Sequence, residues 1–420
     1  MIPEYDVAVI GGGPAGSTAA TLLAQKGRRV VLLEREKFPR FHIGESLLPY
    51  SMDIFERLGV REKLDQIALP KIGGEVATTS GGHGVKFYFK FGFNLRHQSA
   101  YQVVRADFDK LLLDNASANG VQVREETAVE KLAFDHAGVT LDVRSKNGAS
   151  EMIRAAYLLD CSGRNAVVGT HFKLKQSYPQ LQKFSVFAHF EGMPRDSEGA
   201  GVFTHLIRGK EHWIWIIPVT PTRTSVGVVM DTSAFKKLRK SPEQVLEEFL
   251  ANSDEIRQRM AGGTRVTQVY STSDYSYRNL RFTGDRWMMA GDAAGFIDPI
   301  WSTGVFIALL SGEKAADAMD RALTDSSKRT ELFRRYDRRV NRVMDLYLRL
   351  VNAWYRSEFV EVFMNPTERF QLAPAVNAAL AGNIGGGFAI WWRMQLFYLI
   401  LFLQRFMALC PRLNLIPKTT

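Results

Sequence analysis

The first residues of the chain show the clearest pattern of apolar and polar positions. A continuous apolar run, "YDVAVI" at residues 5–10, is followed by a glycine-rich stretch, by apolar residues at helical spacing, and by a second apolar run that ends at Glu34. Continuous apolar runs of this length are typical of buried parallel strands. The pattern predicts a strand, a tight turn, an amphipathic helix and a second strand, which together make one βαβ unit.

The turn of this unit carries three glycines at the spacing of a dinucleotide-binding motif. Gly11 permits the tight turn, Gly13 the close approach of a pyrophosphate, and Gly16 the packing of the helix on the strand. Glu34 then lies where a carboxylate binds ribose hydroxyls. A glycine triplet alone is compatible with a tight turn in another α/β protein, but the complete unit favours dinucleotide binding.

The pattern changes twice further along the chain. Residues 72–104 and 172–232 alternate apolar and polar positions between turn signals, which predicts half-buried antiparallel strands in a second sheet. Residues 104–117 have helical spacing, and residues 155–169 predict a buried strand that ends in a glycine turn. Helical periodicity dominates from about residue 305 onward. We therefore expect an α/β protein with a helical C-terminal part.

Composition and charge narrow the classes of partner. The net charge of +10 favours acidic partners, but the basic clusters at 236–240 and 334–342 are not accompanied by a nucleic-acid motif. We expect no nucleic-acid binding. Cys161 and Cys410 lie far apart without metal-ligand spacing, so we expect no metal site and a reducing compartment. The first residues lack the pattern of a signal peptide, and we expect a cytoplasmic location.

Residues 285–319 form a second candidate cofactor segment. They predict a strand, a Gly-Asp turn, a loop containing proline, and a long helix. Asp292 in this turn is a candidate to bind the ribityl chain of a flavin. A carboxylate in a glycine turn is also compatible with a structural cap, but its combination with the N-terminal glycine motif favours the flavin.

Three segments together carry a family resemblance. The stretches "GGGPAG", "DCSGR" and "GDAAGFIDP", at residues 11–16, 160–164 and 291–299, are similar to the FAD-dependent monooxygenase fold of aromatic hydroxylases and geranylgeranyl reductases. The resemblance implies a Rossmann-like FAD-binding domain, an antiparallel-sheet substrate domain and a helical C-terminal part. The expected ranges are 1–70, 101–171 and 270–320 for the FAD-binding domain, 71–100 and 172–269 for the sheet domain, and 321–420 for the helical part.

Four further matches resemble flavin-dependent halogenases. "WIWIIP" places Trp213, Trp215, Ile217 and Pro218 in a Trp-x-Trp-x-Ile-Pro motif, and "FIDPIWSTG" matches Phe-x-x-Pro-x-x-Ser-x-Gly. The segment "RFHIGESLLP", residues 40–49, looks like the stretch along the flavin ring, and "LPKIGG" places a lysine at the position of the catalytic lysine. The chain looks shorter than the tryptophan halogenases and shows no counterpart of their Glu-Ser pair. This favours the branch that acts on phenols, pyrroles and carrier-tethered or lipophilic aromatics.

The resemblance assigns candidate site residues. It implies three catalytic positions, Lys71, Trp213 and Trp215. Residues expected to bind the cofactor are Gly11, Gly13, Ala15, Gly16, Glu34, Arg35, Arg40, Gly44, Glu45, Ser46, Arg105, Val129, Asp292, Gly304 and Val305. A halide site is expected at Ser302, Thr303 and Gly304, where Ser302 is predicted to cap a helix whose first N–H groups favour an anion.

The resemblance also implies the reaction. Reduced FAD and O2 give a C4a-hydroperoxide that oxidises chloride or bromide to hypohalous acid, and a lysine directs the halogen to a small aromatic or carrier-tethered substrate. We expect a separate flavin reductase, because the sequence contains only one dinucleotide glycine motif. The alternative is a flavin-dependent hydroxylase or a geranylgeranyl-reductase-like oxidoreductase on the same fold.

Lys71 and the two tryptophans each have an ordinary interpretation. Lys71 follows Pro70 in what reads as a short loop before a strand, where most lysines are solvated. The resemblance instead implies an amine that polarises hypohalous acid or forms a chloramine. On a strand, Trp213 and Trp215 share one face, and Ile214 faces the other way. Such pairs usually belong to a core, whereas the resemblance implies a barrier between flavin and substrate.

Residues 388–412 are the most apolar stretch of the chain. Only 11 uncharged residues separate Arg393 from Arg405, so we expect no membrane-spanning helix. A helix apolar nearly all round must be covered. We expect it to pack on the substrate domain. The alternatives are a groove for a lipophilic substrate and a peripheral contact with anionic lipid, the second being the basis for a non-catalytic, membrane-associated flavoprotein.

Overall fold

A computed structural model describes residues 3–82, 84–198, 201–383 and 385–416. The predicted βαβ unit is present: β1 (Tyr5–Ile10) and β2 (Val30–Leu33) are parallel neighbours, and α1 (Pro14–Ala24) connects them. Both strands are almost wholly buried, as their continuous apolar runs predict.

The first sheet has seven strands and is partly parallel. Its order is β6 (Gln122–Arg124), β2, β1, β9 (Ser150–Asp160), β8 (Val139–Ser145) and β7 (Thr127–Phe134), with β19 (Trp287–Met289) paired to β9. The strands β6, β2, β1, β9 and β19 run parallel, and β7–β9 form an antiparallel extension. Helix α1 packs against α4 (Arg105–Ala118) and α9 (Thr303–Thr324).

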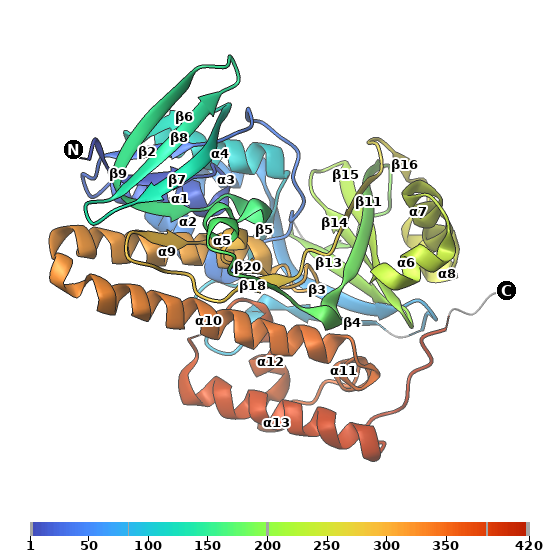
Figure 1. Cartoon of the computed structure of the whole chain (residues 1–420). Coiled ribbons are helices and arrows are strands. Elements are labelled where there is room, and N and C mark those ends of the chain that lie inside the picture. Colours follow the sequence, from blue (N-terminus) through green and yellow to red (C-terminus); the bar gives the residue numbers. More distant parts are fainter. Residues whose placement is uncertain (1–2, 83, 199–200, 384, 417–420) are drawn as a thin grey trace.

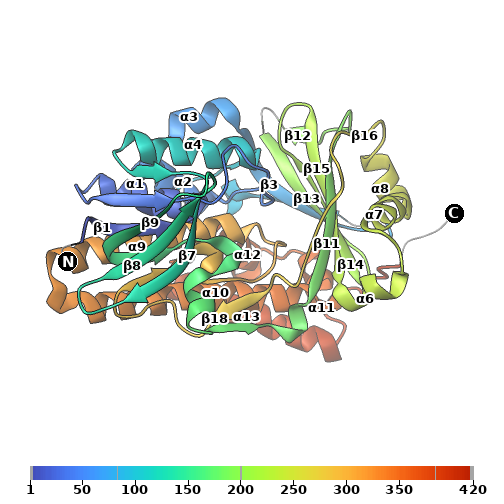
Figure 2. The same ribbon diagram turned by 45° about the horizontal axis from the view of Figure 1, so that its top comes forward.

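The second sheet has ten strands. Its main order is β16 (Thr264–Arg265), β11 (Lys183–Glu191), β15 (Arg223–Asp231), β14 (His212–Pro218), β13 (Gly201–Arg208), β3 (Leu69–Thr78) and β4 (Gly84–Tyr88). Three short strands pair at its sides: β5 (Ala100–Gln102), β12 (Ser197–Glu198) and β17 (Tyr270–Ser273). Figures 1 and 2 show the two sheets side by side.

Two expectations about this sheet are wrong. The strands β3 and β13 pair in parallel, so the sheet is not wholly antiparallel. The strands β11, β13, β14 and β15 are buried on both faces rather than one, because helices α6 (Thr232–Leu238), α7 (Pro242–Ala251) and α8 (Asp254–Arg259) cover the second face. The predicted alternation of the tryptophan strand is confirmed. Trp213 and Trp215 lie in the main core, and Ile214 packs in a separate apolar cluster with residues of α7 and α8.

The remaining helices form most of the C-terminal part, as predicted. They are α10 (Arg329–Trp354), α11 (Ser357–Phe363), α12 (Leu372–Leu380) and α13 (Gly387–Phe406). Figure 1 shows α10 beneath α9, and α13 along the outer edge of the molecule. Short elements complete the fold: α2 (Met52–Leu58), α3 (Arg61–Ile67), α5 (Val167–His171), and a small sheet of β10 (Lys175–Ser177), β18 (Tyr277–Asn279) and β20 (Gly295–Phe296).

Among the described residues, the structure contains no helix of the length and apolarity needed to cross a membrane. The division into three sequence ranges stays a prediction.

Candidate active site

The glycine turn leaves space at one of its three positions. Gly11 has a φ of +100°, and a Cβ there would lie 2.3 Å from the carbonyl oxygen of Cys161. A Cβ on Gly16 would lie 1.9 Å from the carbonyl oxygen of Gly11, so both positions exclude a side chain. Beside Gly13 the nearest atom is Nη2 of Arg40, at 3.6 Å. The N-terminus of α1 is therefore open at Gly13 and flanked by a cation, as a pyrophosphate requires.

Glu34 is fixed at the end of β2. Its Oε2 accepts a hydrogen bond from the N–H of Gly12 at 2.7 Å, and its Oε1 accepts from the N–H of Glu36 at 2.9 Å. A carboxylate has about four acceptor positions, so two remain for ribose hydroxyls. The other two predicted residues nearby are less constrained: Arg35 is exposed, 3.5 Å from Glu36, and Val129 is half-buried in β7.

The 40–49 segment meets α4 and α9 at Gly44. This residue has a φ of +103°, and a Cβ on it would lie 3.0 Å from Nη1 of Arg105 and 3.6 Å from Cγ2 of Val305. Arg105 is buried and donates two hydrogen bonds to Asp109, at 2.8 and 2.9 Å. The structure thus brings together three predicted cofactor residues from three separate segments.

Asp292 lies in a short 3-10 turn between β19 and α9. Burial raises the pKa of its carboxyl to about 6, and the charges of Arg105 and Arg164 act in the opposite direction. Within the described part of the chain its carboxylate accepts no hydrogen bond, which leaves it available to a ribityl hydroxyl. The preceding Gly291 contacts Ala15 of α1, where a Cβ on the glycine would lie 3.0 Å from Cβ of Ala15. The residues present fit FAD.

Glu45 forms a buried pair that the sequence did not predict. Its Oε1 lies 2.7 Å from Nε2 of His189, and its Oε2 is buried without a partner among the described residues. The next residue, Ser46, lies 2.9 Å from the hydroxyl of Thr204. An unpartnered carboxylate oxygen in a core is costly, so a cofactor or water donor at this position is consistent with the expected flavin contact.

The expected halide site coincides with the start of α9. The helix begins at Thr303, as predicted, but Ser302 has a φ of +56° and its hydroxyl makes no capping hydrogen bond. The prediction of a side-chain cap is wrong because the left-handed backbone turns the serine out of the capping position. Thr303 is buried, and a Cβ on Gly304 would lie 3.0 Å from the ring of Phe296. The first N–H groups of a helix have no intrahelical acceptor, so they remain available to an anion.

Lys71 is buried in a strand, not solvated in a loop. It pairs with Ala100 of β5 and Val202 of β13, and only 3% of its surface is exposed. Its ammonium donates to the carbonyl oxygen of Leu47 at 3.1 Å and lies 5.2 Å from the ring centre of Phe89. Burial lowers the pKa of Lys71 to about 7. The amine therefore has both protonation states accessible near neutral pH.

The tryptophan pair is held rigidly in the main core. The two ring centres lie 5.9 Å apart. The indole N–H of Trp213 donates to the hydroxyl of Tyr355 at 3.1 Å, and that of Trp215 donates to the hydroxyl of Ser225 at 3.1 Å. Tyr355 in turn donates to Oδ2 of Asp298 at 2.8 Å. The sequence did not predict these partners, although Asp298 lies within the "FIDP" stretch.

The tryptophan pair and Lys71 lie at different points of the same sheet. Lys71 pairs with Val202, which lies four positions before Leu206, the partner of Trp215. At ~3.3 Å per residue the separation along the strands is about 13 Å. The contacts of the Lys71 ammonium are instead the carbonyl oxygen of Leu47 and the ring of Phe89.

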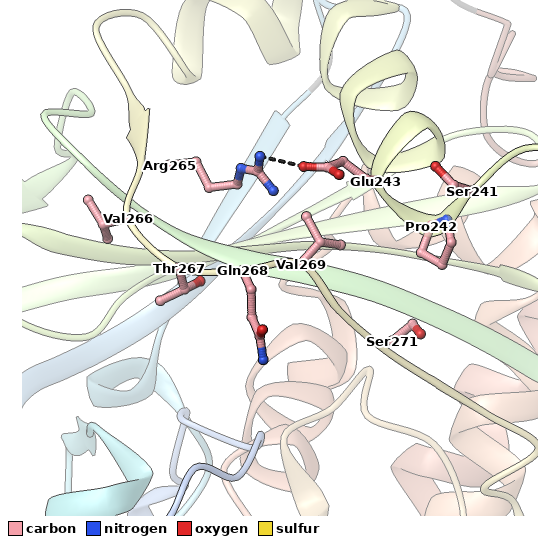
Figure 3. Close-up of a pocket in the computed structure, with 9 residues that line it drawn as sticks. All are labelled: Ser241, Pro242, Glu243, Arg265, Val266, Thr267, Gln268, Val269 and Ser271. Carbon is pink, nitrogen blue, oxygen red and sulfur yellow. Dashed lines mark ion pairs between the residues drawn. The ribbon is translucent and has the colours of Figure 1, made fainter.

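A pocket of about 730 Å³ lies elsewhere, beside α7 and the strands β16 and β17 (Figure 3). An ion pair between Arg265 and Glu243 crosses it, at 2.5 Å. Of the residues that the structure describes, those lining the pocket include none of the predicted site residues. One of them, Val269, packs in the cluster on the face opposite the tryptophan pair, so the pocket is separate from the candidate site.

Three comparisons with known proteins agree with this geometry. A family model described as "FAD binding domain" matches residues 4–347. The chain is 29% identical to a 1H-pyrrole-2-carbonyl-[peptidyl-carrier protein] chlorinase of Pseudomonas fluorescens, over 88% of this chain and 87% of the relative. It is 33% identical to a 1H-pyrrole-2-carbonyl-[peptidyl-carrier protein] brominase of Pseudoalteromonas luteoviolacea, over 79% of this chain and 80% of the relative. The solved structure of the flavin-dependent brominase Bmp2 superposes with a TM-score of 0.84 at 28% identity, over 96% of this chain and 100% of that one.

Proposed function

Because this chain belongs to the flavin-dependent halogenases and is an FAD-dependent halogenase, we propose that Lys71 directs the halogen to an electron-rich aromatic substrate. The observation that carries this proposal is the burial of Lys71 without a carboxylate partner among the described residues. When FAD is bound in reduced form, its chemistry with O2 oxidises chloride or bromide to hypohalous acid. The chain's own residues then decide where that oxidant goes.

The amine of Lys71 would act as a hydrogen-bond donor or as a nucleophile. In its protonated form it donates to the oxygen of hypohalous acid, which makes the halogen more electrophilic. In its neutral form its nitrogen attacks the halogen of hypohalous acid: the N–halogen bond forms as the O–halogen bond breaks, and the hydroxide takes a proton from the amine and leaves as water. Burial lowers the pKa of Lys71 to about 7, so neither form is a rare species at neutral pH. The Leu47 carbonyl holds the amine in place without supplying a countercharge.

The N-terminus of α9 would position the halide, and the tryptophan pair would keep the organic substrate away from the flavin. Thr303 and Gly304 present the first N–H groups of a 22-residue helix, which favours a halide. Trp213 and Trp215 are buried and hydrogen-bonded, so they form a fixed apolar surface on the core side of β14. Their proposed role is to keep the organic substrate away from the flavin.

The names of the relatives indicate the class of organic substrate. The names of two relatives specify, as their substrate, a pyrrole-2-carbonyl group attached to a peptidyl carrier protein. We propose a pyrrole or phenol, free or tethered to a carrier, for this chain. We also propose that a separate flavin reductase supplies reduced FAD and that the protein acts in the cytoplasm.

A halogenation assay tests the proposed function. Purified protein with FAD, a generic flavin reductase, O2 and bromide or chloride is given three acceptors: monochlorodimedone, a free phenol, and pyrrole-2-carboxyl on a carrier protein. We expect halide-dependent consumption of monochlorodimedone and a halogenated product from an aromatic acceptor. Oxidation of the aromatic acceptor without halide would contradict the proposal and favour a hydroxylase. A product only from the carrier-bound acceptor would define the substrate class.

A further inference from the structure

The outer side of α13 is an uncovered apolar face. Five of its large side chains are strongly exposed: Phe388 at 75%, Trp391 at 58%, Leu399 at 50%, Phe402 at 59% and Phe406 at 68%. At 100° per residue these positions fall on one side of the helix. Figure 1 shows this helix at the edge of the molecule, with no other element beyond it. We call these five residues the α13 outer face.

The opposite side of α13 accounts for its attachment to the protein. Ile390, Met394 and Phe397 are buried in the main core, where Phe397 packs edge-on against Phe359 of α11. Gln404 is buried too and donates to Glu361 at 2.8 Å. The helix therefore has one covered apolar side and one uncovered apolar side. An exposed face of this kind marks a surface that another phase or partner covers.

Charge identifies the partner. Residues 369–420 contain five basic side chains and no aspartate or glutamate: Arg369, Arg393, Arg405, Arg412 and Lys418. Arg393 donates to the carbonyl oxygens of Phe370 and Ala389, and Arg412 is ion-paired with Glu361 of α11, so the exposed Arg369 and Arg405 carry the unpaired positive charge among the described residues. Arg405 is exposed beside the outer face, with its guanidinium 5.8 Å from the ring centre of Phe406. A second copy of this segment would oppose like charges across the contact, whereas an anionic surface complements them.

We propose that the α13 outer face docks onto a lipid surface that carries anionic headgroups, with the helix axis parallel to the surface. The aromatic and leucine side chains enter the boundary between headgroups and acyl chains, and the exposed Arg405 contacts the headgroups. This docking does not depend on the halogenation chemistry.

Vesicle flotation of the full-length FAD-loaded protein tests the docking. We expect the protein to float with vesicles of 70% phosphatidylcholine and 30% phosphatidylglycerol. The amount of protein that floats with pure phosphatidylcholine vesicles should be at least about five-fold lower, because these vesicles lack the anionic headgroups that attract the basic side chains. Replacing Phe388, Trp391, Phe402 and Phe406 together by serine should lower flotation at least about ten-fold.

A matched control separates docking from general surface apolarity. Met152 and Leu280 are exposed to 74% and 61% but lie on other parts of the molecule, so the double variant Met152→Ser/Leu280→Ser should float like the parent. Absorbance of bound FAD and the melting temperature verify that each variant is folded. No flotation of the parent, or equal flotation of the four-serine variant, would overturn the proposal. A dimer in light scattering that the four serines dissociate would show that the face pairs two copies instead.

Discussion

Two lysines are buried at the start of strands in the ten-stranded sheet, and their surroundings differ. Lys183, the first residue of β11, lies 2.5 Å from Oδ1 of Asp231 and 3.6 Å from the ring centre of Tyr355. Lys71 in β3 has a carbonyl oxygen and, farther away, the ring of Phe89. The exposed fractions are 6% and 3%, so burial alone does not distinguish them.

This difference shows what makes one buried lysine a structural cation and another a reactive amine: the presence or absence of a neighbouring carboxylate. A carboxylate beside a buried lysine stabilises the charged form and makes the side chain part of the framework. Without it, burial disfavours the charged form and lowers the pKa of Lys71 to about 7. Perturbed amines of this kind are typical of functional sites.

The largest effect is expected from Lys71→Ala. Halogenated product per flavin oxidised should fall at least ~100-fold, because the variant lacks the group that directs the oxidant. FAD binding and flavin reoxidation should continue, since Lys71 is not among the residues that fit the cofactor. The measurement compares product by chromatography with flavin oxidation by absorbance. Full activity in Lys71→Met would remove the proposed role.

The next effect concerns stability and pH. Between pH 7 and about 10, Lys71 is protonated in the unfolded chain and largely neutral in the folded protein, so the unfolded state binds more protons and stability rises with pH. Lys71→Met lacks this proton linkage. Its gain in unfolding free energy should be largest at pH 7 or below and shrink by up to ~1.4 kcal/mol per pH unit above that.

Denaturant unfolding at pH 6.5, 8 and 9.5 measures this gain. Lys183→Met is the matched control and should lower the free energy of unfolding instead of raising it, because it removes a buried cation that is paired with Asp231. An equal gain of Lys71→Met at all three pH values would contradict the lowered pKa.

A smaller effect on stability is expected from replacing Tyr355, whose ring packs beside Lys183. Tyr355→Phe leaves the indole N–H of Trp213 and a carboxylate oxygen of Asp298 without their partner. The free energy of unfolding should fall by about 1–3 kcal/mol. Tyr50→Phe is the control, because the Tyr50 hydroxyl makes no hydrogen bond to any residue that the structure describes. An unchanged urea midpoint for Tyr355→Phe would show that water replaces the hydroxyl.

The smallest effect is expected from Gly304→Leu. A side chain at this position would crowd the ring of Phe296 and the N-terminus of α9. The halide concentration for half-maximal rate should rise about two- to five-fold, as the loss of a helix-terminus contact with an anion predicts. FAD absorbance verifies that the cofactor site is intact. An unchanged halide dependence would place the anion elsewhere.

Local patterns predicted the parts of the site that lie within one segment. The glycine turn, Glu34 and the shared face of Trp213 and Trp215 follow from spacing alone. The periods of strands and helices are visible within a few neighbouring residues of the sequence. His189 and Tyr355 were missed, since their partners Glu45 and Asp298 are 144 and 57 residues away. The Lys71 strand was misjudged because Pro70 is also a turn residue, and alternation does not reveal whether β3 and β13 run parallel.

The parallel pairing of β3 with β13 has a consequence for the order of folding. Lys71 meets Val202 across roughly 130 residues of intervening chain, so closing this loop is entropically costly compared with forming the β13–β14 hairpin. Non-local pairings of this kind form slowly. We therefore expect the ammonium of Lys71 to lose its hydration late in folding. A refolding experiment should show a late phase whose rate increases with pH, because a neutral amine enters the core more readily than a charged one.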